Sequence, residues 1–382
     1  MNLKTQTKLH KFVAIAALLA ASVTNLSAQK LIEFDPPGAS TAAAQICMPY
    51  YCGTFSYANN DLGVIVGTYM DSNIVSHGFL RLPNGHFISF NAPGAGLGAG
   101  LFQGTVASAI NNLGAVAGYV QDPNNVYHAF IRHPGGSFTS FDAPGAGSGA
   151  NQGTLALKIN LWGEVAGYYL DANNAFHGFV RSPNGKITSF DRPGALFIGP
   201  FSLDDDGEIL GEFEDAQGIF HSFIREPEGK MTVFDAPGAG TVSNTGTLAG
   251  GINRQGEVAA YYEDSNNLSH GFIRSPSGHY TIFEAPGSAT SGRMDSIVGT
   301  STSGINSSGS VVGTDGDQNG VWHGFVRSPR GSFTVFNAPH AGAGVGQGTI
   351  AQTINTFGEV AGYYTDAQFL NHGFLWLPWG DR

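Results

Sequence analysis

The sequence predicts an all-β fold, a seven-bladed β-propeller in which each blade has four short strands. Two short motifs each occur seven times in the 382 residues, and successive copies of the first motif stand 44 to 53 residues apart. Strand-sized segments separated by turns with Gly, Asn and Pro fill each repeat, and no helical period is visible after residue 28. Four strands in a repeat of this length are typical of a propeller blade, and the closed ring hides the edges of the sheets.

The composition indicates a folded chain rich in turns. The 55 glycines and 18 prolines make up about 19% of the chain, below the ~25–30% of low-complexity sequences, and only 12% of the residues are charged. The formal net charge of -11 provides no basic surface for phosphate backbones. We therefore expect no nucleic-acid partner.

Residues 1–28 have the pattern of a secretory signal peptide. Three lysines precede an apolar core from Phe12 to Ala21, and small residues stand before Gln29. The core is too short for the ~20 residues of a membrane-spanning helix, so we expect no membrane span and a secreted or periplasmic protein. Residues 29–382 are then predicted to form a single propeller domain.

The two cysteines, Cys47 and Cys52, lie in one short segment of this exported chain. An oxidising compartment favours a local disulfide between them. Two thiols alone are an incomplete metal site, and we expect neither a metal nor a cofactor.

The first repeated motif is a His-small-Phe triplet. Its copies begin at His77, His128, His177, His221, His270, His323 and His372. The second motif, Phe-acid/amide-x-Pro, begins at Phe34, Phe90, Phe141, Phe190, Phe234, Phe283 and Phe336. Because the chain starts with the second motif and ends after the first, residues 30–35 are predicted to pair beside residues 372–376 and close the ring.

Within the third repeat, the four predicted strands are Thr154 to Asn160, Glu164 to Asp171, His177 to Arg181 and Lys186 to Asp191. Asn and Gly in the turns accept positive φ, and Pro presets φ. The fourth repeat is shorter and its inner segment, Ile198 to Asp204, is irregular. Whether the fourth repeat forms a regular blade is left open by the sequence.

An aspartate stands six residues before each triplet histidine. The pairs are Asp71/His77, Asp122/His128, Asp171/His177, Asp215/His221, Asp264/His270, Asp317/His323 and Asp366/His372. One interpretation is a ring of acid/base or metal-binding pairs. The favoured interpretation is structural, because the two residues flank one hairpin in every blade and can satisfy its polar groups.

Two other recurring residue types have structural interpretations. A Gly-Thr pair precedes most inner strands, and its threonine hydroxyl is a candidate member of the same polar network; these residues are Thr54, Thr105, Thr154, Thr247, Thr300 and Thr349. Paired tyrosines, such as Tyr168 and Tyr169, are predicted to pack between neighbouring blades rather than to form sugar-stacking platforms.

The triplets resemble the extracellular repeat family named for its His-Ala-Phe motif. The motif stands here as His128-Ala129-Phe130 and elsewhere mostly as His-Gly-Phe, and the resemblance covers residues 30–376. It implies an exported, bacterial repeat protein. It implies no activity and no catalytic residues.

One face of the predicted ring, the connection face, carries the blade-to-blade connections and the turns between second and third strands. The connections into blades six, seven and one depart from the repeat and contain Arg293, Asp295, His340, Tyr50 and Tyr51. We hypothesise that these residues form a binding patch beside the central channel. Ordinary variation of loops is the alternative interpretation.

The other face, here called the asparagine face, carries the turns between first and second strands. The residue before the turn glycine is apolar in four consecutive blades, at Phe357, Leu62, Leu113 and Trp162. We hypothesise that this apolar arc is an exposed partner surface. The alternative is that the four side chains fold inward as packing.

The sequence favours a non-catalytic module that binds a carbohydrate or a protein. The rival is a glycan hydrolase or lyase with a site at the channel mouth. No nucleophile elbow, phosphate loop, zinc spacing or isolated carboxylate pair supports the rival. Lys158 is the one basic side chain on an inner strand. A lysine solvated in the channel is a more common case than a catalytic lysine.

Overall fold

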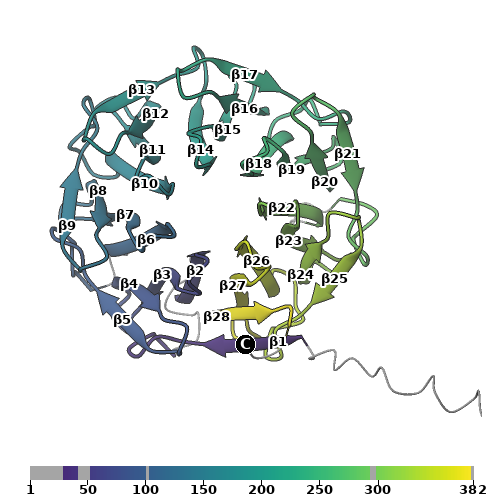
Figure 1. Cartoon of the computed structure of the whole chain (residues 1–382), viewed down its shortest axis with the longest axis horizontal. Coiled ribbons are helices and arrows are strands. Elements are labelled where there is room, and N and C mark those ends of the chain that lie inside the picture. Colours follow the sequence, from purple (N-terminus) through teal and green to yellow (C-terminus); the bar gives the residue numbers. More distant parts are fainter. Residues whose placement is uncertain (1–28, 42–51, 100–102, 293–297, 380–382) are drawn as a thin grey trace, which may run out of the picture.

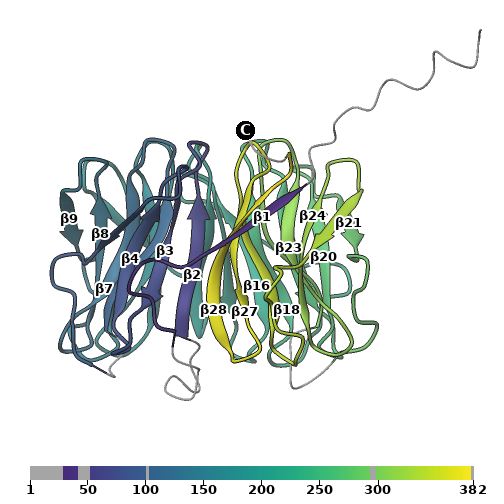
Figure 2. The same ribbon diagram turned by 90° about the horizontal axis from the view of Figure 1, so that it is seen from below.

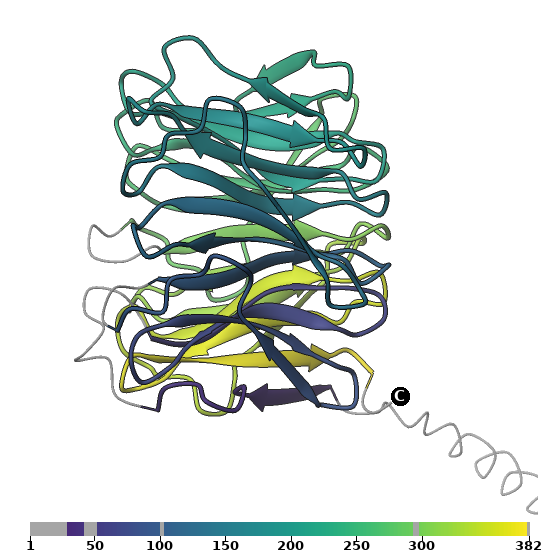
Figure 3. The same ribbon diagram turned by 90° about the vertical axis from the view of Figure 1, so that its left-hand side faces the viewer.

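The computed structural model of the chain describes residues 29–41, 52–99, 103–292 and 298–379. The described residues form 28 strands in seven blades, and Figure 1 shows the blades arranged in a ring. Figures 2 and 3 show the ring edge-on, with the strands crossing its thickness from face to face. The predicted seven-bladed propeller is confirmed. Within the described ranges, no helix has the length and apolar character needed to cross a membrane.

The strands of each blade follow one order from the channel outward. The inner strands are β2 (Cys52–Asn59), β6 (Gly104–Ile110), β10 (Gly153–Ile159), β14 (Phe197–Leu203), β18 (Gly246–Ile252), β22 (Gly299–Ile305) and β26 (Gly348–Ile354). The second strands are β3 (Ile65–Met70), β7 (Val116–Gln121), β11 (Val165–Leu170), β15 (Ile209–Glu214), β19 (Val258–Glu263), β23 (Val311–Gly316) and β27 (Val360–Thr365).

The third strands carry the His-small-Phe triplets. They are β4 (Ser76–Arg81), β8 (Tyr127–Arg132), β12 (Phe176–Arg181), β16 (Phe220–Arg225), β20 (Ser269–Arg274), β24 (Trp322–Arg327) and β28 (Leu370–Leu377). The short outer strands are β5 (Phe87–Phe90), β9 (Phe138–Phe141), β13 (Ile187–Phe190), β17 (Met231–Phe234), β21 (Tyr280–Phe283), β25 (Phe333–Phe336) and β1 (Lys30–Phe34).

The fourth blade is regular. Its inner strand β14 pairs antiparallel with β15, and the register shifts between Pro200 and Ser202. Blade three has the same shift between Ala156 and Lys158. A bulge at this position is therefore part of the blade design, and the irregular sequence of the fourth repeat is accommodated without losing a strand.

The N-terminal strand closes the ring. β1 pairs antiparallel with β28, with Lys30 opposite Leu377 and Phe34 opposite Gly373. Figure 2 shows β1, in purple, beside β28, in yellow. The seventh blade is thus built from both ends of the described chain, as the offset between the two motifs predicts.

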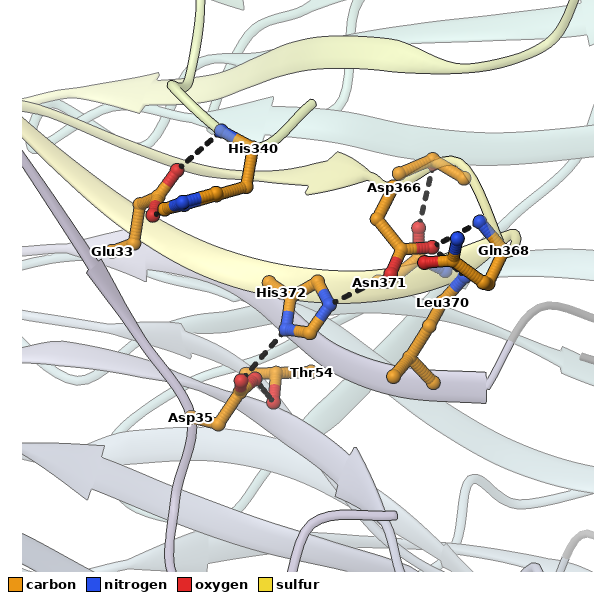
Figure 4. Close-up of polar contacts among 10 residues, drawn as sticks. Glu33, Asp35, Thr54, His340, Asp366, Gln368, Leu370, Asn371 and His372 are labelled. Carbon is orange, nitrogen blue, oxygen red and sulfur yellow. Dashed lines mark hydrogen bonds and ion pairs between the residues drawn. The ribbon is translucent and has the colours of Figure 1, made fainter. Parts of the chain in front are cut away.

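A polar network at this closure ties blade seven to blade one (Figure 4). His372 Nδ1 lies 2.7 Å from Asp35 Oδ2. The hydroxyl of Thr54, on the inner strand of blade one, donates to Asp35 Oδ1 at 2.6 Å. Asp35 therefore joins three segments: the first strand, the last strand and the first inner strand.

We expect Asp35→Ala to lower the free energy of unfolding by about 1 kcal/mol, because His372 and Thr54 both lose their acceptor at a partly exposed site. Asp35→Asn is the matched control, since blades one and six use Asn91 and Asn337 at the equivalent position. Chemical denaturation of the three proteins measures the difference. Equal losses for both variants would contradict this role.

The triplet phenylalanines form the core of every blade. All seven are among the largest fully buried side chains: Phe79, Phe130, Phe179, Phe223, Phe272, Phe325 and Phe374. The middle residue of the triplet is small because the outer phenylalanine covers it; a Cβ on Gly178 would lie 2.2 Å from the Phe190 ring.

Outer phenylalanines also hold neighbouring blades together. The Phe141 ring of blade two meets Phe179 of blade three edge-on, with the centroids 6.1 Å apart. The guanidinium of Arg181, also in blade three, lies 4.8 Å from the centroid of the same Phe141 ring. The same cation-π contact, between an arginine of one blade and the outer phenylalanine of the preceding blade, recurs around the ring. Each contact helps to hold two neighbouring blades together.

A ring of side-chain amides runs around the asparagine face. Each turn asparagine donates its Nδ2 to the carbonyl oxygen of the equivalent residue in the next blade, at 3.0 to 3.2 Å; the donors are Asn60, Asn111, Asn160, Asn253, Asn306 and Asn355. Blade four has Asp204 at this position. Asp204 Oδ2 is buried and has no hydrogen-bond partner, so the amide ring is interrupted once.

Candidate functional site

The repeated aspartate and histidine organise one hairpin in each blade. Asp171 Oδ1 accepts hydrogen bonds from the backbone N–H groups of Asn173 at 2.7 Å and Ala175 at 2.9 Å. His177 Nε2 lies 3.6 Å from Asp171 Oδ2, and His177 Nδ1 lies 2.6 Å from Asp191 Oδ1. The hydrogen bond from Ala175, with that from Asn173, lowers the pKa of Asp171.

These contacts support the structural interpretation of the pairs. The polar atoms of each histidine face two groups of its own blade, and in blade three the ring also stacks on Tyr169 with the centroids 4.7 Å apart. In the described part of the chain, no group of three or more His, Cys, Asp or Glu side chains is placed to hold a metal ion. The pairs thus secure the turn between the second and third strands.

The inner-strand threonines link neighbouring blades. In blade three, Thr154 Oγ1 accepts the backbone N–H of Ala143, which belongs to the connection from blade two, at 2.9 Å. Four other threonines make the same bond. Thr54 differs because the equivalent residue is Pro36, which has no N–H, and its hydroxyl instead joins the Asp35 and His372 network.

Most of the predicted connection-face patch lies outside the described residues. Tyr50, Tyr51, Arg293 and Asp295 fall there, so the patch stays a prediction. His340 is described: its Nδ1 lies 2.5 Å from Glu33 Oε2, and Figure 4 shows the pair. Because Glu33 is on the outermost strand β1, His340 lies at the outer edge of the ring rather than beside the channel.

The predicted apolar arc is exposed on the asparagine face. The exposed fractions are 47% for Phe357, 62% for Leu62, 65% for Leu113 and 61% for Trp162. The indole of Trp162 donates its Nε1–H to the carbonyl oxygen of Asp205 at 2.9 Å. The four side chains therefore do not fold inward, and their role as a partner surface stays a prediction.

Only one cysteine of the predicted disulfide is among the described residues. Cys52 is buried at the start of β2, where it packs with Ile74 and Leu370. Cys47 lies outside the described residues. The Cys47–Cys52 disulfide stays a prediction.

The central channel contains a cavity of about 350 Å³ that the sequence analysis did not predict. Six of the seven blades contribute lining residues, and blade six contributes more of them than any other blade. The aromatic side chains of its wall are Tyr57, Phe201, Tyr261, Trp322 and Tyr363. A volume of this size lies in the range of small-molecule sites in proteins.

One second-strand position carries a large tyrosine in four blades and a smaller threonine in blades one and six. In blades two, three, five and seven, a second-strand tyrosine occupies one equivalent position: Tyr119, Tyr168, Tyr261 and Tyr363. Such a ring packs against the next blade, as Tyr168 does on Phe197 with the centroids 5.7 Å apart. Blade six has Thr314 at this position, opposite Ser301 of its own inner strand.

Hydroxyl groups line the resulting recess. Ser301 Oγ donates to the carbonyl oxygen of Thr314 at 3.0 Å. Thr302 Oγ1 and Thr314 Oγ1 are buried and have no hydrogen-bond partner. An unsatisfied buried hydroxyl costs free energy, and both residues belong to the lining of the cavity.

Lys158 is the one charged residue among those that line the cavity. Burial lowers the pKa of its ammonium group. Glu212 lies behind the wall, where its Oε2 accepts the backbone N–H of the lining residue Ala249 at 2.8 Å. Burial raises the pKa of Glu212 to about 7.

Sequence reasoning identified Lys158 but missed the cavity. A repeat-by-repeat alignment contains the signal, because Thr314 stands where four repeats have tyrosine and Ser301 and Ser303 stand on the adjacent inner strand.

No protein-family model and no curated protein matches the chain. It is similar in structure to a streptogramin B lyase, with a TM-score of 0.56 and 13% identity over 91% of this chain and 97% of the lyase. The lectin BP39L from Burkholderia pseudomallei has a TM-score of 0.56 and 8% identity over 87% of this chain and 98% of the lectin.

A puromycin hydrolase is also similar, with a TM-score of 0.52 and 11% identity. That match covers 88% of this chain but 54% of the hydrolase. At such low identities, these similarities establish the β-propeller fold alone.

Proposed function

We propose that this protein is an exported, non-catalytic propeller that binds a carbohydrate in its central channel. The observation that carries the proposal is the combination of aromatic walls with unsatisfied hydroxyl groups in one cavity. Aromatic faces pack on the apolar faces of sugar rings, and hydroxyl groups exchange hydrogen bonds with sugar hydroxyls. Export is supported by the signal-peptide pattern of residues 1–28.

Binding is favoured over catalysis by the residues of the cavity. Glycoside hydrolysis ordinarily uses a pair of carboxyl groups flanking the scissile bond. Among the described residues, the lining of the cavity includes no Asp, Glu, His or Cys. The fold does not choose between the two functions, since it is shared with a lectin as well as with a lyase and a hydrolase.

We expect Thr314→Tyr to reduce glycan binding by about tenfold or more, because it restores the ring found in four other blades and fills the recess. The measurement is binding of the mature protein, residues 29–382, to a broad glycan array, followed by titration calorimetry on each hit. Trp162→Asp is the control: it changes the apolar arc and leaves the channel intact.

A Tyr50→Ala/Tyr51→Ala variant separates the channel from the predicted connection-face patch. Loss of binding in this variant, with binding retained in Thr314→Tyr, would move the site to the connection face. Absence of any glycan hit would contradict the proposal and turn attention to a protein partner for the apolar arc.

A further inference from the structure

We infer that the carbohydrate bound in the channel is an acidic sugar whose carboxylate pairs with the ammonium group of Lys158. This inference rests on the proposed function and specifies the ligand class of the same site. It follows from the position of Lys158, from the charge of the cavity wall and from the other groups that line the cavity.

The position of Lys158 is otherwise occupied by small residues. At the bulge of the inner strand, the equivalent residues in blades one, two, four, six and seven are Ala58, Ala109, Ser202, Gly304 and Thr353. This part of the inner strand is crowded: a Cβ on Gly251 in blade five would lie 2.9 Å from Cα of Gly304 in blade six. A lysine here departs from the repeat, and its side chain reaches the cavity.

The ammonium group has no counter-charge in the wall. Among the described residues that line the cavity, none is acidic. Burial, with no compensating carboxylate, lowers the pKa of Lys158. A desolvated cation without a partner is costly, whereas an anionic ligand would repay that cost through a charge-assisted hydrogen bond.

The surroundings specify a carboxylate on a sugar rather than a bare anion. One ammonium group matches a single negative charge, while phosphate and sulfate groups favour arginine forks and clusters of donors. The unsatisfied hydroxyls of Thr302 and Thr314 and the rings of Tyr261 and Trp322 lie in the same cavity. A uronic acid residue offers a carboxylate, ring hydroxyls and an apolar ring face together.

The test compares ligands that differ only at the acidic group. Titration calorimetry measures the binding of the mature protein to digalacturonic acid, to its methyl ester and to the matching neutral galactose disaccharide. We expect the acid to bind about tenfold more tightly than either neutral ligand, as one charge-assisted hydrogen bond would provide. The preference should decrease as salt screens the pair.

Variants assign the preference to Lys158. In Lys158→Met the acid and the neutral ligands should bind equally, and in Lys158→Arg the preference should remain. Lys186→Met is the matched control, because Lys186 is an exposed lysine of the same blade. The comparison of the three ligands uses the unmutated protein. It therefore still tests the inference if a variant fails to fold.

The outcomes separate this inference from the proposed function. Binding of neutral sugars that Thr314→Tyr abolishes, with no preference for the acid, would overturn the inference and leave the proposed function standing. A preference for sulfated or phosphorylated sugars would also overturn it. Absence of saccharide binding of every kind would overturn both.

Discussion

Replacing the triplet phenylalanine of one blade, as in Phe179→Ala, is expected to lower the free energy of unfolding by about 3–5 kcal/mol. Phe179 is fully buried and packs edge-on with Phe141 of the preceding blade. Truncation to alanine leaves a cavity between two blades. The closed ring of blades limits how far these two blades can move together, so the cavity is filled only in part. Urea unfolding of the mature protein measures the loss.

The histidine of the same triplet is the control. The side chain of His177 is 24% exposed and makes its polar contacts at the surface of the blade. His177→Ala should therefore cost about 1 kcal/mol, less than the phenylalanine. A loss for His177→Ala as large as that for Phe179→Ala would contradict the assignment of the blade core to the phenylalanines.

The protein is expected to become more stable as the pH is lowered from about 8 to about 5. Burial raises the pKa of Glu212 to about 7 from its ordinary 4.5. Burial likewise raises the pKa of Asp204 to about 6, and that of Asp315 to about 6, from 3.8. A scan of melting temperature against pH measures the change.

The sign follows from proton linkage. Between the unfolded and folded pKa values, the folded state of each of these acids binds more protons than the unfolded state, so unfolding becomes less favourable as the pH falls. Hydrogen bonding to Glu284 raises the pKa of His270, which acts in the same direction, because that stabilisation is lost as the pH rises. Below about pH 4, aspartates with lowered pKa values, such as Asp171, lose their ionised form and stability falls again.

Asp204 provides the sharpest variant for this prediction. Asp204→Asn should place an amide donor where six other blades have one, complete the ring of amides through the carbonyl of Asn253, and remove a buried charge. We expect it to raise stability at pH 8 by about 1–3 kcal/mol and to weaken the pH dependence.

The neighbouring Asp206 is the matched control for Asp204. It is an exposed residue of the same turn, 3.6 Å from the guanidinium of Arg254. Burial is the largest cause of the raised pKa of Asp204 and the charge of Asp206 a smaller one, so Asp206→Asn should weaken the pH dependence much less than Asp204→Asn. If Asp204→Asn instead lowered the stability at pH 8, the prediction that the buried Asp204 carboxylate destabilises the fold would be contradicted.

The parts of the structure that the sequence predicted are those written into every repeat. The aspartate of the turn, the triplet and the outer phenylalanine each act within one blade or on its neighbour, so seven copies reveal their role. The pairing of β1 with β28 followed from the offset of two motifs, and the register confirms it. The position of Trp162 in a turn left open whether the apolar arc is exposed or packed inward, and the structure shows that it is exposed.

The candidate site could not be predicted in the same way. Lys158 and Thr314 are separated by 156 residues in the chain and line one cavity because the ring brings inner strands of distant repeats to a common axis. Within its own blade, Thr314 is an ordinary strand residue. Its small size matters only at the boundary with blade seven, where a tyrosine ring would otherwise fill the space.

The number of blades, the strand order within each blade and the closure of the ring could be predicted from the sequence, because they depend on local turns and on contacts repeated with a fixed period. The cavity in the channel, the buried hydroxyls without partners and the carboxyl groups shielded from water became apparent only in the folded ring. Those properties depend on side chains from different blades that share one small space, and no single repeat contains them.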